Sequence, residues 1–307
     1  MKAVITGATG AVGMALVSAL IKKNCEVLVL CRPGSERNAR LSKIKGVKIA
    51  ECGLSELKHY QARQSYDVFF HLGWAGTTGQ ARNDMYLQNK NVKYTLDAVN
   101  LAHRMGCRTF VGVGSQAEYG RVSGKLSSLT PTNPENGYGI AKLTASSMSR
   151  ILCRELGMKH VWARILSVYG EYDGENSMVM STINKILNGV IPDFTPAGQI
   201  WDYMYSEDAA EALIAISERG KDGAVYCLGS GDPKPLCDYI KMIRDAVDKK
   251  AALGIGRLPY ADNQVMYLCA DISELTRDTG FVPQYSFSEG IARTVKWVRS
   301  KNVVISR

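Results

Sequence analysis

The sequence predicts an α/β fold in which helices cover both faces of a parallel sheet, followed by a smaller second domain. Through the first half of the chain, short continuous apolar runs alternate with segments of helical spacing, and such runs are typical of strands buried on both faces. A glycine-rich turn joins the first run to the first helical segment. The chain has 307 residues, 46% of them hydrophobic, which is ample for a large core.

The predicted elements follow one another along the chain. Strands are expected at residues 2–6, 26–31, 48–50, 67–72, 109–113 and 160–165, and helices at 12–23, 55–62, 82–105 and 138–156. A helix at 206–218 and a strand at 224–228 are expected to return to the sheet. Two later helices are expected, at 238–247 and from Ser286, whose spacing to Glu289 is that of a capping box. We therefore expect one domain over residues 1–168, with returning pieces near 205–228, and a smaller, partly interleaved domain over 169–204 and 229–307.

Composition and charge disfavour several functions. The eight cysteines never form a C-x-x-C pair and the four histidines are scattered, so we expect neither a disulfide framework nor a metal site. The formal charge of +9 comes from lysines and arginines spread along the chain, without a motif for binding nucleic acid. No apolar run approaches the roughly 18 residues of a membrane span, and no signal-like leader precedes the first strand. These features predict a soluble, cytoplasmic protein with no nucleic-acid or membrane partner.

The turn after the first strand has the pattern of a phosphate-binding loop. Gly7 would permit the tight turn, Gly10 would let the backbone approach a pyrophosphate, and Gly13 would allow close packing of the helix. The N-terminus of that helix offers N–H groups and a favourable dipole to an anion. A glycine triplet is weak evidence alone, but its place between a strand and a helix predicts a dinucleotide-binding domain.

The end of the second predicted strand bears on the choice of dinucleotide. An acidic residue at this point binds the ribose 2′-hydroxyl of NAD, whereas an arginine accommodates the 2′-phosphate of NADP. Here Arg32, Ser35 and Arg37 follow the strand, and no acidic residue stands at its end. Glu36 leaves NAD open as an alternative. Because a guanidinium binds phosphate through two hydrogen bonds, we expect NADP(H) to be favoured over NAD(H).

Three further residues form a candidate catalytic group. Tyr138 and Lys142 lie four positions apart at the start of a predicted helix, so both project from one face. A nearby ammonium ion would lower the pKa of the phenol, about 10 when free, and make it a usable acid or base. Ser115 follows the strand at 109–113 and could hydrogen-bond the reacting oxygen. The pattern predicts acid–base chemistry around Tyr138.

Taken together, these motifs resemble the extended short-chain dehydrogenase/reductase family, in its branch of nucleotide-sugar epimerases, dehydratases and ketoreductases. The matching stretches are residues 6–13, 70–72, 91–92, 114–115, 119–120, 138–142, 164–170, 201–211 and 270–275. The resemblance implies a Rossmann-type doubly wound parallel sheet with a smaller substrate domain. It also implies that Tyr138 exchanges a proton with the substrate oxygen, while the nicotinamide exchanges hydride with the attached carbon. Lys142 would bind the nicotinamide ribose and lower the pKa of Tyr138, and Ser115 would orient the oxygen.

The resemblance also assigns binding residues. The cofactor is expected to contact Gly7, Thr9, Gly10, Ala11, Val12, Gly13, Arg32, Ser35, Arg37, Leu54, Leu72, Gly73, Tyr138, Lys142, Ile165 and Val168. The substrate, expected to be a nucleotide-activated sugar, would contact Trp74, Gln116, Ser167 and Trp201. Trp74 stands where small residues are usual, and filling the cleft wall is an equally good interpretation of it.

The residues after Ser115 bear on the reaction. Family members that dehydrate sugars carry Thr-Asp-Glu here, because eliminating water needs an acid and a base beyond the tyrosine. This chain has Gln116 and Ala117 instead, and Glu118 comes one position late, where a strand-like segment would turn it to the other face. A dehydratase is therefore disfavoured. The expected function is an NADPH-dependent 4-ketoreductase acting on a nucleotide-linked 4-keto-6-deoxyhexose, and an NAD-dependent 4-epimerase is the alternative.

Two departures from the family pattern keep further alternatives open. Ser167 stands where many members have asparagine, and Trp201 replaces an arginine that would clamp the substrate diphosphate. Arg257 or a lysine of the C-terminal domain could substitute for that arginine. A reductase of a non-nucleotide carbonyl therefore stays an alternative, since the fold does not fix the substrate. A cofactor-binding protein without turnover is a further one, which the intact catalytic group disfavours.

The two long helices predicted at 82–105 and 138–156 carry apolar residues beyond a single stripe. These are Val92, Leu96, Val99, Leu143, Met148 and Leu152. By the resemblance, the helices could pair across a two-fold axis into a four-helix interface, although packing on the sheet explains part of the pattern equally well. We expect a homodimer.

Overall fold

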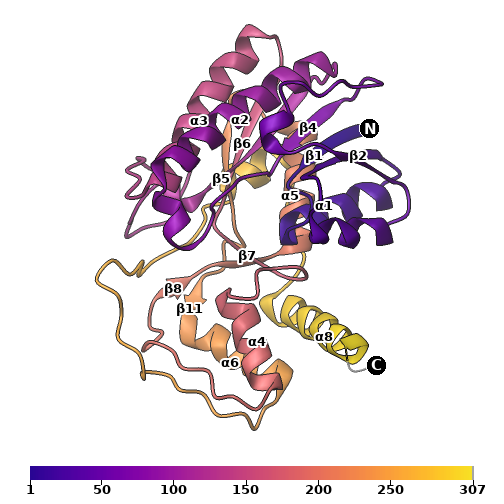
Figure 1. Ribbon diagram of the computed structural model, residues 1–307. Helices are drawn as coiled ribbons and strands as arrows, with labels where there is room; N and C mark the ends of the chain where they lie inside the picture. The colour runs from indigo at the N-terminus through magenta and orange to yellow at the C-terminus, as the bar shows by residue number, and fades with distance from the viewer. Residues whose placement is uncertain (306–307) are drawn as a thin grey trace.

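The computed structural model describes the backbone of residues 1–305 and the side chains of residues 1–301, and it has two lobes (Figure 1). The larger lobe is a seven-stranded sheet with helices on both faces. The smaller lobe lies at one end of this sheet and is built mainly from the C-terminal part of the chain (Figure 1). The predicted Rossmann-type α/β class is confirmed, whereas the exact boundary between the two domains stays a prediction.

The strands of the large sheet follow the order β10-β6-β5-β4-β1-β2-β3, and every neighbouring pair is parallel. Their bounds are β1 (Lys2–Thr6), β2 (Glu26–Cys31), β3 (Val47–Glu51), β4 (Val68–His71), β5 (Thr109–Ser115), β6 (Lys159–Ile165) and β10 (Val225–Leu228). The order reverses between β1 and β4, and ligands of such sheets bind in the crevice outside the carboxyl ends at this point. The topology therefore places the candidate site at the ends of β1, β4 and β5.

Alternate side chains of the strands fill two separate core layers. On one face, Ala3 and Ile5 pack in a cluster with α1 (Ala11–Lys22) and α5 (Ser206–Arg219). On the other face, Val4 packs in a cluster with α2 (Met85–Arg104) and α3 (Gly137–Glu155). Figure 1 shows these two helix pairs on opposite sides of the sheet. Both faces of β1 are thus buried, as the continuous apolar run predicts.

Side-chain caps fix the points where the two helices nearest the site begin. The Asp84 carboxylate accepts a 3.0 Å hydrogen bond from the N–H of Leu87 at the start of α2. The Asn136 side chain accepts one of 2.9 Å from the N–H of Gly139 at the start of α3. Such caps satisfy N–H groups that have no partner within the helix. Because α3 begins at Gly137, Tyr138 lies in its first turn.

The smaller lobe combines three helices with two short strand pairs. The helices are α4 (Met178–Leu187), α6 (Leu236–Val247) and α8 (Phe287–Ile305), and the strand pairs join β7 (Ser167–Tyr169) to β9 (Tyr203–Tyr205) and β8 (Ile200–Trp201) to β11 (Lys234–Pro235). A short helix, α7 (Ser273–Thr279), precedes α8. The predicted capping box is confirmed, because the N–H of Ser286 donates to Glu289 at 2.9 Å and the N–H of Glu289 donates back to the Ser286 hydroxyl at 3.3 Å.

One buried carboxylate joins distant segments of the smaller lobe. Asp202 is completely buried and accepts hydrogen bonds from the backbone N–H groups of Ser230 (2.7 Å), Gly231 (3.1 Å) and Ala270 (3.0 Å). It also accepts one of 2.6 Å from the Ser230 hydroxyl. A buried carboxylate with this many donors is fully satisfied. Asp202 therefore fixes the β8–β9 segment against two later parts of the chain.

The helix predicted at 55–62 is wrong, since only the single 3₁₀ turn η2 (Leu54–Glu56) forms there. Arg104, at the end of α2, donates hydrogen bonds to the backbone carbonyls of Leu57 (3.1 Å) and Lys58 (3.0 Å). These carbonyls are the acceptors that a continuing helix would need. A long-range contact thus satisfies the backbone of this segment, which local spacing cannot indicate.

Other differences from the predicted elements are smaller. The helix expected at 82–105 begins at Met85, because the residues before it form the 3₁₀ turn η3 (Gly79–Asn83) and Asp84 then caps α2. Two further 3₁₀ segments were not predicted: η1 (Glu36–Lys43), after β2, and η4 (Gln116–Glu118), directly after β5. The second of these changes the surroundings of Ser115.

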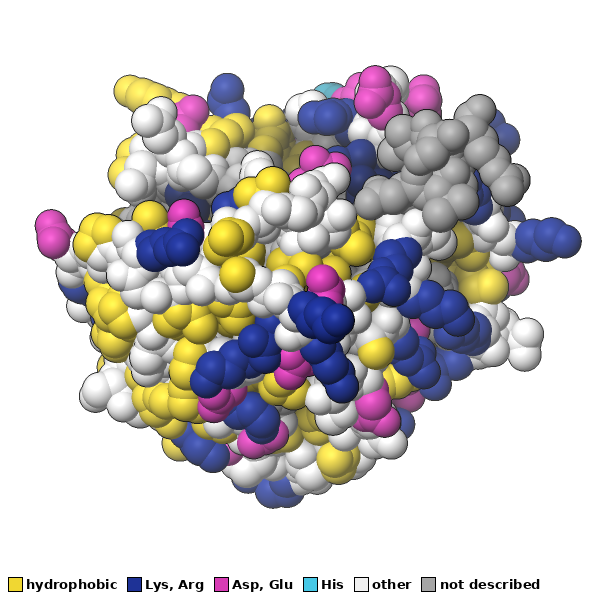
Figure 2. Space-filling view, turned by 90° about the horizontal axis from the view of Figure 1, so that it is seen from below, with side chains coloured by type: hydrophobic (Ala, Val, Ile, Leu, Met, Phe, Trp, Pro, Cys, Tyr) yellow, Lys and Arg dark blue, Asp and Glu magenta, His cyan; other side chains and the backbone are white. Residues whose placement is uncertain are grey.

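The surface carries both signs of charge. Figure 2 shows that on the face seen from below the Lys and Arg side chains stand among Asp, Glu and uncharged groups. Within residues 1–305, no helix combines the length and the apolar character needed to cross a membrane. In the described part of the chain, no three His, Cys, Asp or Glu side chains gather as metal ligands would.

Candidate active site

Each glycine of the phosphate loop meets a different structural requirement. Gly7 has φ +75°, and a Cβ there would come within 2.6 Å of the backbone N of Gly73, so the loop after β1 passes closely over the loop after β4. A Cβ on Gly13 would collide with the backbone of Gly7 and Ala8. Gly10, by contrast, faces open space within 4 Å. The loop therefore has the tight turn, the close helix packing and the accessible backbone that a pyrophosphate site needs.

A cavity of about 500 Å³ lies beside this loop, outside the ends of β1, β2 and β4. Predicted cofactor residues that line it are Gly7, Thr9, Arg32, Ser35, Arg37, Leu54 and Gly73. The predicted residues Val12, Leu72, Ile165 and Val168 do not line it and are half-buried side chains packed on the core. Ala11 instead lines a second cavity on the other side of α1. The structure thus brings seven of the sixteen predicted cofactor residues to the lining of one crevice.

The far end of this cavity is basic. Arg32 and Arg37 are exposed on its rim, and in residues 1–301 neither side chain has a carboxylate partner within ion-pair distance. Asn38 donates a 3.0 Å hydrogen bond to the carbonyl of Arg32 and so fixes the turn that carries them. Glu56 is the one carboxylate among the lining residues, and it accepts a 2.5 Å hydrogen bond from the N–H of Gly53. Glu36, the candidate for the acidic role in NAD binding, does not line the cavity.

The predicted catalytic residues meet where β5 ends and α3 begins. The Ser115 hydroxyl accepts a 3.2 Å hydrogen bond from the N–H of Ala117 and caps η4. Tyr138 is buried in the first turn of α3, beside Ser115. One turn later, the Lys142 ammonium donates a 2.5 Å hydrogen bond to the carbonyl of Val113. It lies 5.9 Å from the centre of the Tyr138 ring.

The pKa of Tyr138 differs from the sequence-based expectation. Burial raises it above the ordinary value, while the Ser115 hydroxyl and the Arg82 guanidinium lower it and the Glu118 carboxylate raises it. Arg82 is thus a cation beside Tyr138 that the sequence did not indicate. The Lys142 ammonium is directed to the Val113 carbonyl, and its effect on Tyr138 stays a prediction.

The Lys142 side chain is completely enclosed by protein. Burial lowers the pKa of Lys142 to about 7, and the Glu118 carboxylate acts in the opposite direction. The Trp74 ring covers the ammonium, with 3.8 Å between Nζ and the ring centre. Trp74 is held in turn by a 2.8 Å hydrogen bond from its indole N–H to Gln88. Trp74 therefore shields Lys142, and it also lines the cavity beside the glycine loop. Both the substrate role and the packing role stay predictions.

Glu118 is a site residue whose role the sequence did not reveal. It is completely buried and accepts hydrogen bonds from the backbone N–H of Ser115 (2.9 Å), the indole of Trp162 (3.0 Å) and the guanidinium of Arg164 (2.7 Å). The strand alternation from which its orientation was predicted does not apply, because η4 turns the chain directly after β5. These donors satisfy the buried carboxylate.

The predicted substrate residues lie in two places. Trp201 and Ser167 touch, since the indole N–H donates a 2.9 Å hydrogen bond to the Ser167 hydroxyl. Gln116 lies in η4 directly after Ser115 and is half-buried. Arg257, the suggested replacement for the missing diphosphate clamp, is exposed and forms a 3.0 Å ion pair with Asp193.

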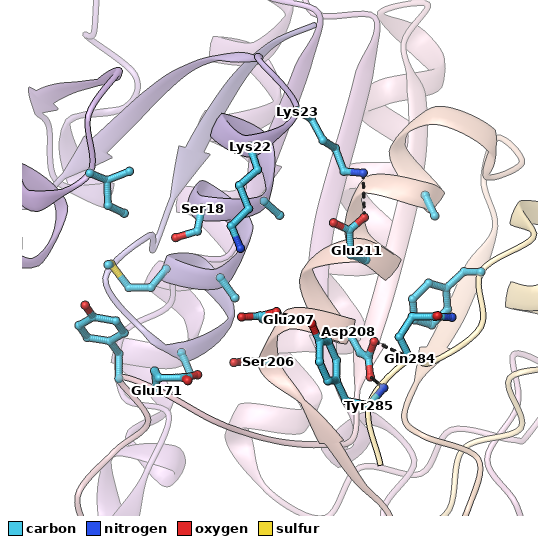
Figure 3. A pocket seen from close by; sticks show the side chains of 18 of the residues that line it. Ser18, Lys22, Lys23, Glu171, Ser206, Glu207, Asp208, Glu211, Gln284 and Tyr285 are labelled. Carbon is cyan, nitrogen blue, oxygen red and sulfur yellow. Dashed lines mark hydrogen bonds and ion pairs between the residues drawn. The ribbon is translucent and has the colours of Figure 1, made fainter. Parts of the chain in front are cut away.

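The second cavity is larger, about 820 Å³, and lies between α1, the start of α5 and the segment before α8 (Figure 3). Its carboxylates already have protein partners. Glu211 pairs with Lys23 at 3.1 Å, and Asp208 accepts a 3.0 Å hydrogen bond from the N–H of Tyr285 (Figure 3). Tyr138 and Lys142 line neither this cavity nor the one beside the glycine loop. Its polar groups join α1, α5 and the C-terminal segment rather than facing the catalytic group.

The glycine loop, the crevice at the strand switch and the Ser115, Tyr138 and Lys142 group define a nicotinamide-dependent oxidoreductase of the extended short-chain dehydrogenase/reductase class. The chain belongs to the NAD-dependent epimerase/dehydratase family, whose model matches residues 3–229.

Individual relatives are distant. An uncharacterized protein of Methanocaldococcus jannaschii is 25% identical over 235 residues, which are 75% of this chain and 72% of that protein. A dTDP-glucose 4,6-dehydratase of Xanthomonas campestris is 24% identical over 201 residues, 61% of this chain and 57% of the enzyme. One from Escherichia coli is 25% identical over 179 residues, 55% of this chain and 49% of the enzyme. The match thus spans about half the length of these dehydratases.

Solved structures agree on the fold. The UDP-N-acetylglucosamine 4-epimerase of Methanobrevibacter ruminantium has a TM-score of 0.88 and 22% identity, with 98% of each chain covered. The dTDP-glucose 4,6-dehydratase DesIV of Streptomyces venezuelae, solved with NAD, has a TM-score of 0.84 and 19% identity, covering 99% of this chain and 98% of its own. At these identities the likeness establishes the fold alone.

Proposed function

We propose that this protein is an NADP(H)-dependent 4-ketoreductase that acts on a nucleotide-linked 4-keto-6-deoxyhexose. The observation that carries the choice of cofactor is the pair of arginines, Arg32 and Arg37, on the rim of the crevice. In the described residues they have no carboxylate partner, and the one carboxylate of the lining is engaged with its own turn. A 2′-phosphate would supply the missing anion, whereas a 2′-hydroxyl would leave both charges unpaired.

The residues present fit such a cofactor. The accessible backbone at Gly10 and the first turn of α1 would hold the pyrophosphate, and the arginines would hold the ribose phosphate. When bound, the cofactor supplies the hydride that adds to the carbonyl carbon. Tyr138 gives its proton to the carbonyl oxygen, so that an alcohol forms, and the Ser115 hydroxyl hydrogen-bonds that oxygen. The Lys142 ammonium, fixed by Val113, contributes positive charge beside the reacting groups.

The residues that follow Ser115 offer no free carboxylate, which favours hydride transfer without elimination of water. Gln116 and Ala117 supply no acid or base. Glu118 is taken up by Arg164, Trp162 and the backbone of Ser115, so it is not free to exchange protons with a substrate. Removing water from a sugar would need such a group in addition to Tyr138. These contacts support a reductase over a dehydratase.

A 4-epimerase is the second candidate. It needs the same tyrosine and no further carboxylate, and the structural neighbours include 4-epimerases of UDP-sugars by name. An epimerase returns the hydride within one binding event and therefore keeps its cofactor bound. We propose that NADP binds at an open rim lined by arginines, from which it can leave after each turnover. A reductase requires such release of the cofactor, so we favour a reductase over an epimerase.

We also propose a homodimer formed through α2 and α3. Of the apolar positions that suggested this interface, Val92 and Val99 are buried in the core, and only Met148 is an exposed large side chain, at 43%. The exposed apolar surface instead includes Ile140 and Ile151 of α3 and Tyr86 of α2. A patch of this kind on two adjacent helices supports pairing with a second copy.

The function is tested by following NADPH at 340 nm with dTDP- and UDP-linked 4-keto-6-deoxyglucose. We expect stoichiometric oxidation of NADPH, a much slower reaction with NADH, and loss of turnover in Tyr138→Phe while that variant still binds NADPH. Incubation with UDP-glucose in parallel monitors the formation of its 4-epimer. No oxidation with either ketosugar, together with epimer formation, would reverse the order of the two candidates.

A further inference from the structure

Arg82 lies over the face of the catalytic tyrosine. Its guanidinium carbon is 4.5 Å from the centre of the Tyr138 ring. The side chain comes from η3, which is fixed against α3 because the Asn83 side chain accepts a 3.0 Å hydrogen bond from the N–H of Gly137. Gln88 holds the same turn through a 2.8 Å hydrogen bond to the carbonyl of Ala81. The position of the guanidinium is therefore built into the fold.

Within residues 1–301, the Arg82 guanidinium has no carboxylate partner. Its polar contact is a 3.4 Å hydrogen bond to the carbonyl of Thr77, and no ion pair forms between it and another residue of the described part of the chain. The side chain is half-buried. A cation held against an aromatic face in this way interacts favourably with the ring, and more strongly when the ring carries negative charge.

Charged and polar groups face Tyr138 from several elements. Ser115 comes from the end of β5, Glu118 from η4 and Lys142 from α3 itself. The Glu118 carboxylate is bound to Arg164, and the Lys142 ammonium to the carbonyl of Val113. Burial raises the pKa of Tyr138, and Arg82 is the cation that lowers it. Among these groups, Arg82 alone combines full positive charge with direct contact to the ring.

We propose that Arg82 is a positioning residue of the reaction, whose guanidinium stabilises the phenolate form of Tyr138 and so makes this tyrosine a usable acid–base group. Its consequence for turnover rests on the proposed hydride-transfer function. The coupling between Arg82 and Tyr138 does not, because the titration of Tyr138 can be measured without substrate.

The first test is the titration of Tyr138 by NMR of protein labelled with ¹³C at the tyrosine Cζ, with its resonance identified by its loss in Tyr138→Phe. Arg82→Gln should raise the midpoint of this titration, and Arg82→Lys should restore most of the difference. Arg108→Gln is the matched control, since its side chain is 85% exposed, and it should leave the midpoint in place. An unchanged midpoint in Arg82→Gln would overturn the proposal.

The second test is the pH profile of turnover in the direction in which Tyr138 acts as base. Arg82→Gln should shift the rising limb to higher pH and lower kcat at pH 7 about two- to fivefold, the size of a partly exposed cation–π contact. A raised KM with no shift of the rising limb would show that Arg82 binds the substrate. A lowered Tm with no shift of the rising limb would show that Arg82 has only a structural role. Either result overturns the proposal. If the wild-type protein shows no turnover, the proposed function is contradicted. The NMR titration still tests the coupling between Arg82 and Tyr138 in that case, because it needs no substrate.

Discussion

The ammonium group of Lys142 lies 3.8 Å from the centre of the Trp74 ring and donates a 2.5 Å hydrogen bond to the carbonyl of Val113. Gln88 holds the indole N–H of Trp74 at 2.8 Å, so the ring has a fixed place. An aromatic face attracts a cation most strongly where water is excluded. Trp74 is therefore the aromatic face against which the buried Lys142 ammonium lies.

Replacing Trp74 by leucine should lower kcat about ten- to thirtyfold, because the desolvated ammonium loses its aromatic face. Trp74→Phe keeps an aromatic ring but loses the hydrogen bond to Gln88. Its kcat should lie between those of wild type and Trp74→Leu. The matched control is Trp297→Leu, since Lys301 lies 3.7 Å from that ring on α8, away from the site. Steady-state kinetics on the three variants check this. Equal losses in both leucine variants would show that the Trp74 contact has no special role.

Glu118→Gln should lower the free energy of unfolding by about 3 to 5 kcal/mol, because it leaves the buried Arg164 guanidinium without its partner. Glu135→Gln removes the partner of Arg121 in an exposed pair and should cost only about 0.2 to 1 kcal/mol. Urea denaturation of both variants measures the two values. Equal, small losses would mean that the Glu118 pair is not desolvated.

The lowered pKa of Lys142 leads us to expect a specific dependence of the free energy of unfolding on pH. Burial lowers its pKa to about 7 in the folded protein, whereas an unfolded lysine keeps a pKa of about 10.4. Between these values the unfolded chain binds more protons than the folded one, so the contribution of Lys142 to stability rises with pH across this window and is constant below it. Lys142→Met should remove the rise.

The measurement is the free energy of unfolding of wild type minus that of Lys142→Met, at intervals from pH 6 to pH 10. We expect this difference to stay constant up to about pH 7 and then to increase. Lys93→Met, which removes an exposed lysine, serves as the control and should give a flat difference. A flat difference for Lys142→Met as well would show that its pKa is not lowered.

The two arginines at the crevice should discriminate between the cofactors. Substituting Arg32 and Arg37 together by alanine should raise the Kd of NADPH about ten- to a hundredfold, the loss expected for charged hydrogen bonds, and leave that of NADH nearly unchanged. Fluorescence titration of the reduced cofactors measures both constants. Arg63→Ala, outside the cavity lining, is the control. Equal changes for the two cofactors would count against a 2′-phosphate site.

The proposed dimer can be broken at its apolar face. Met148→Asp combined with Ile151→Asp places two charges on the exposed side of α3 and should convert the protein to a monomer at micromolar concentration. Sedimentation velocity measures the change. Val190→Asp, at an exposed position of the other lobe, is the control. Wild-type protein that already sediments as a monomer would refute the interface.

Sequence patterns predict most of the large lobe, because its strands are buried on both faces and its glycine loop has strict backbone requirements. Gly7 illustrates this, since its positive φ is the tight turn that the motif predicts. The spacing of Tyr138 and Lys142 likewise predicts that both lie near Ser115. What the spacing cannot predict is the direction of the Lys142 ammonium, which depends on a carbonyl exposed at the end of β5.

The missed features depend on contacts between distant segments. Arg82 reaches Tyr138 only because Asn83 attaches η3 to the start of α3, and nothing in the local sequence encodes that contact. Strand alternation cannot place Glu118, because η4 replaces the expected strand continuation. The sequence did contain a signal for the pair between Glu118 and Arg164. It is a glutamate shortly after one predicted strand together with an arginine on the neighbouring strand.

The hydrogen bonds of Asp202 have a consequence for the order in which the protein can assemble during synthesis. Domains generally fold from the N-terminus as the chain emerges. The Asp202 carboxylate, however, needs the N–H of Ala270, which is 68 residues further along the chain. The crevice at β1 and β4 can form early, but the opposite wall is held in place only once most of the chain has been made. We therefore expect a nascent chain to acquire a cofactor crevice well before it can enclose a substrate.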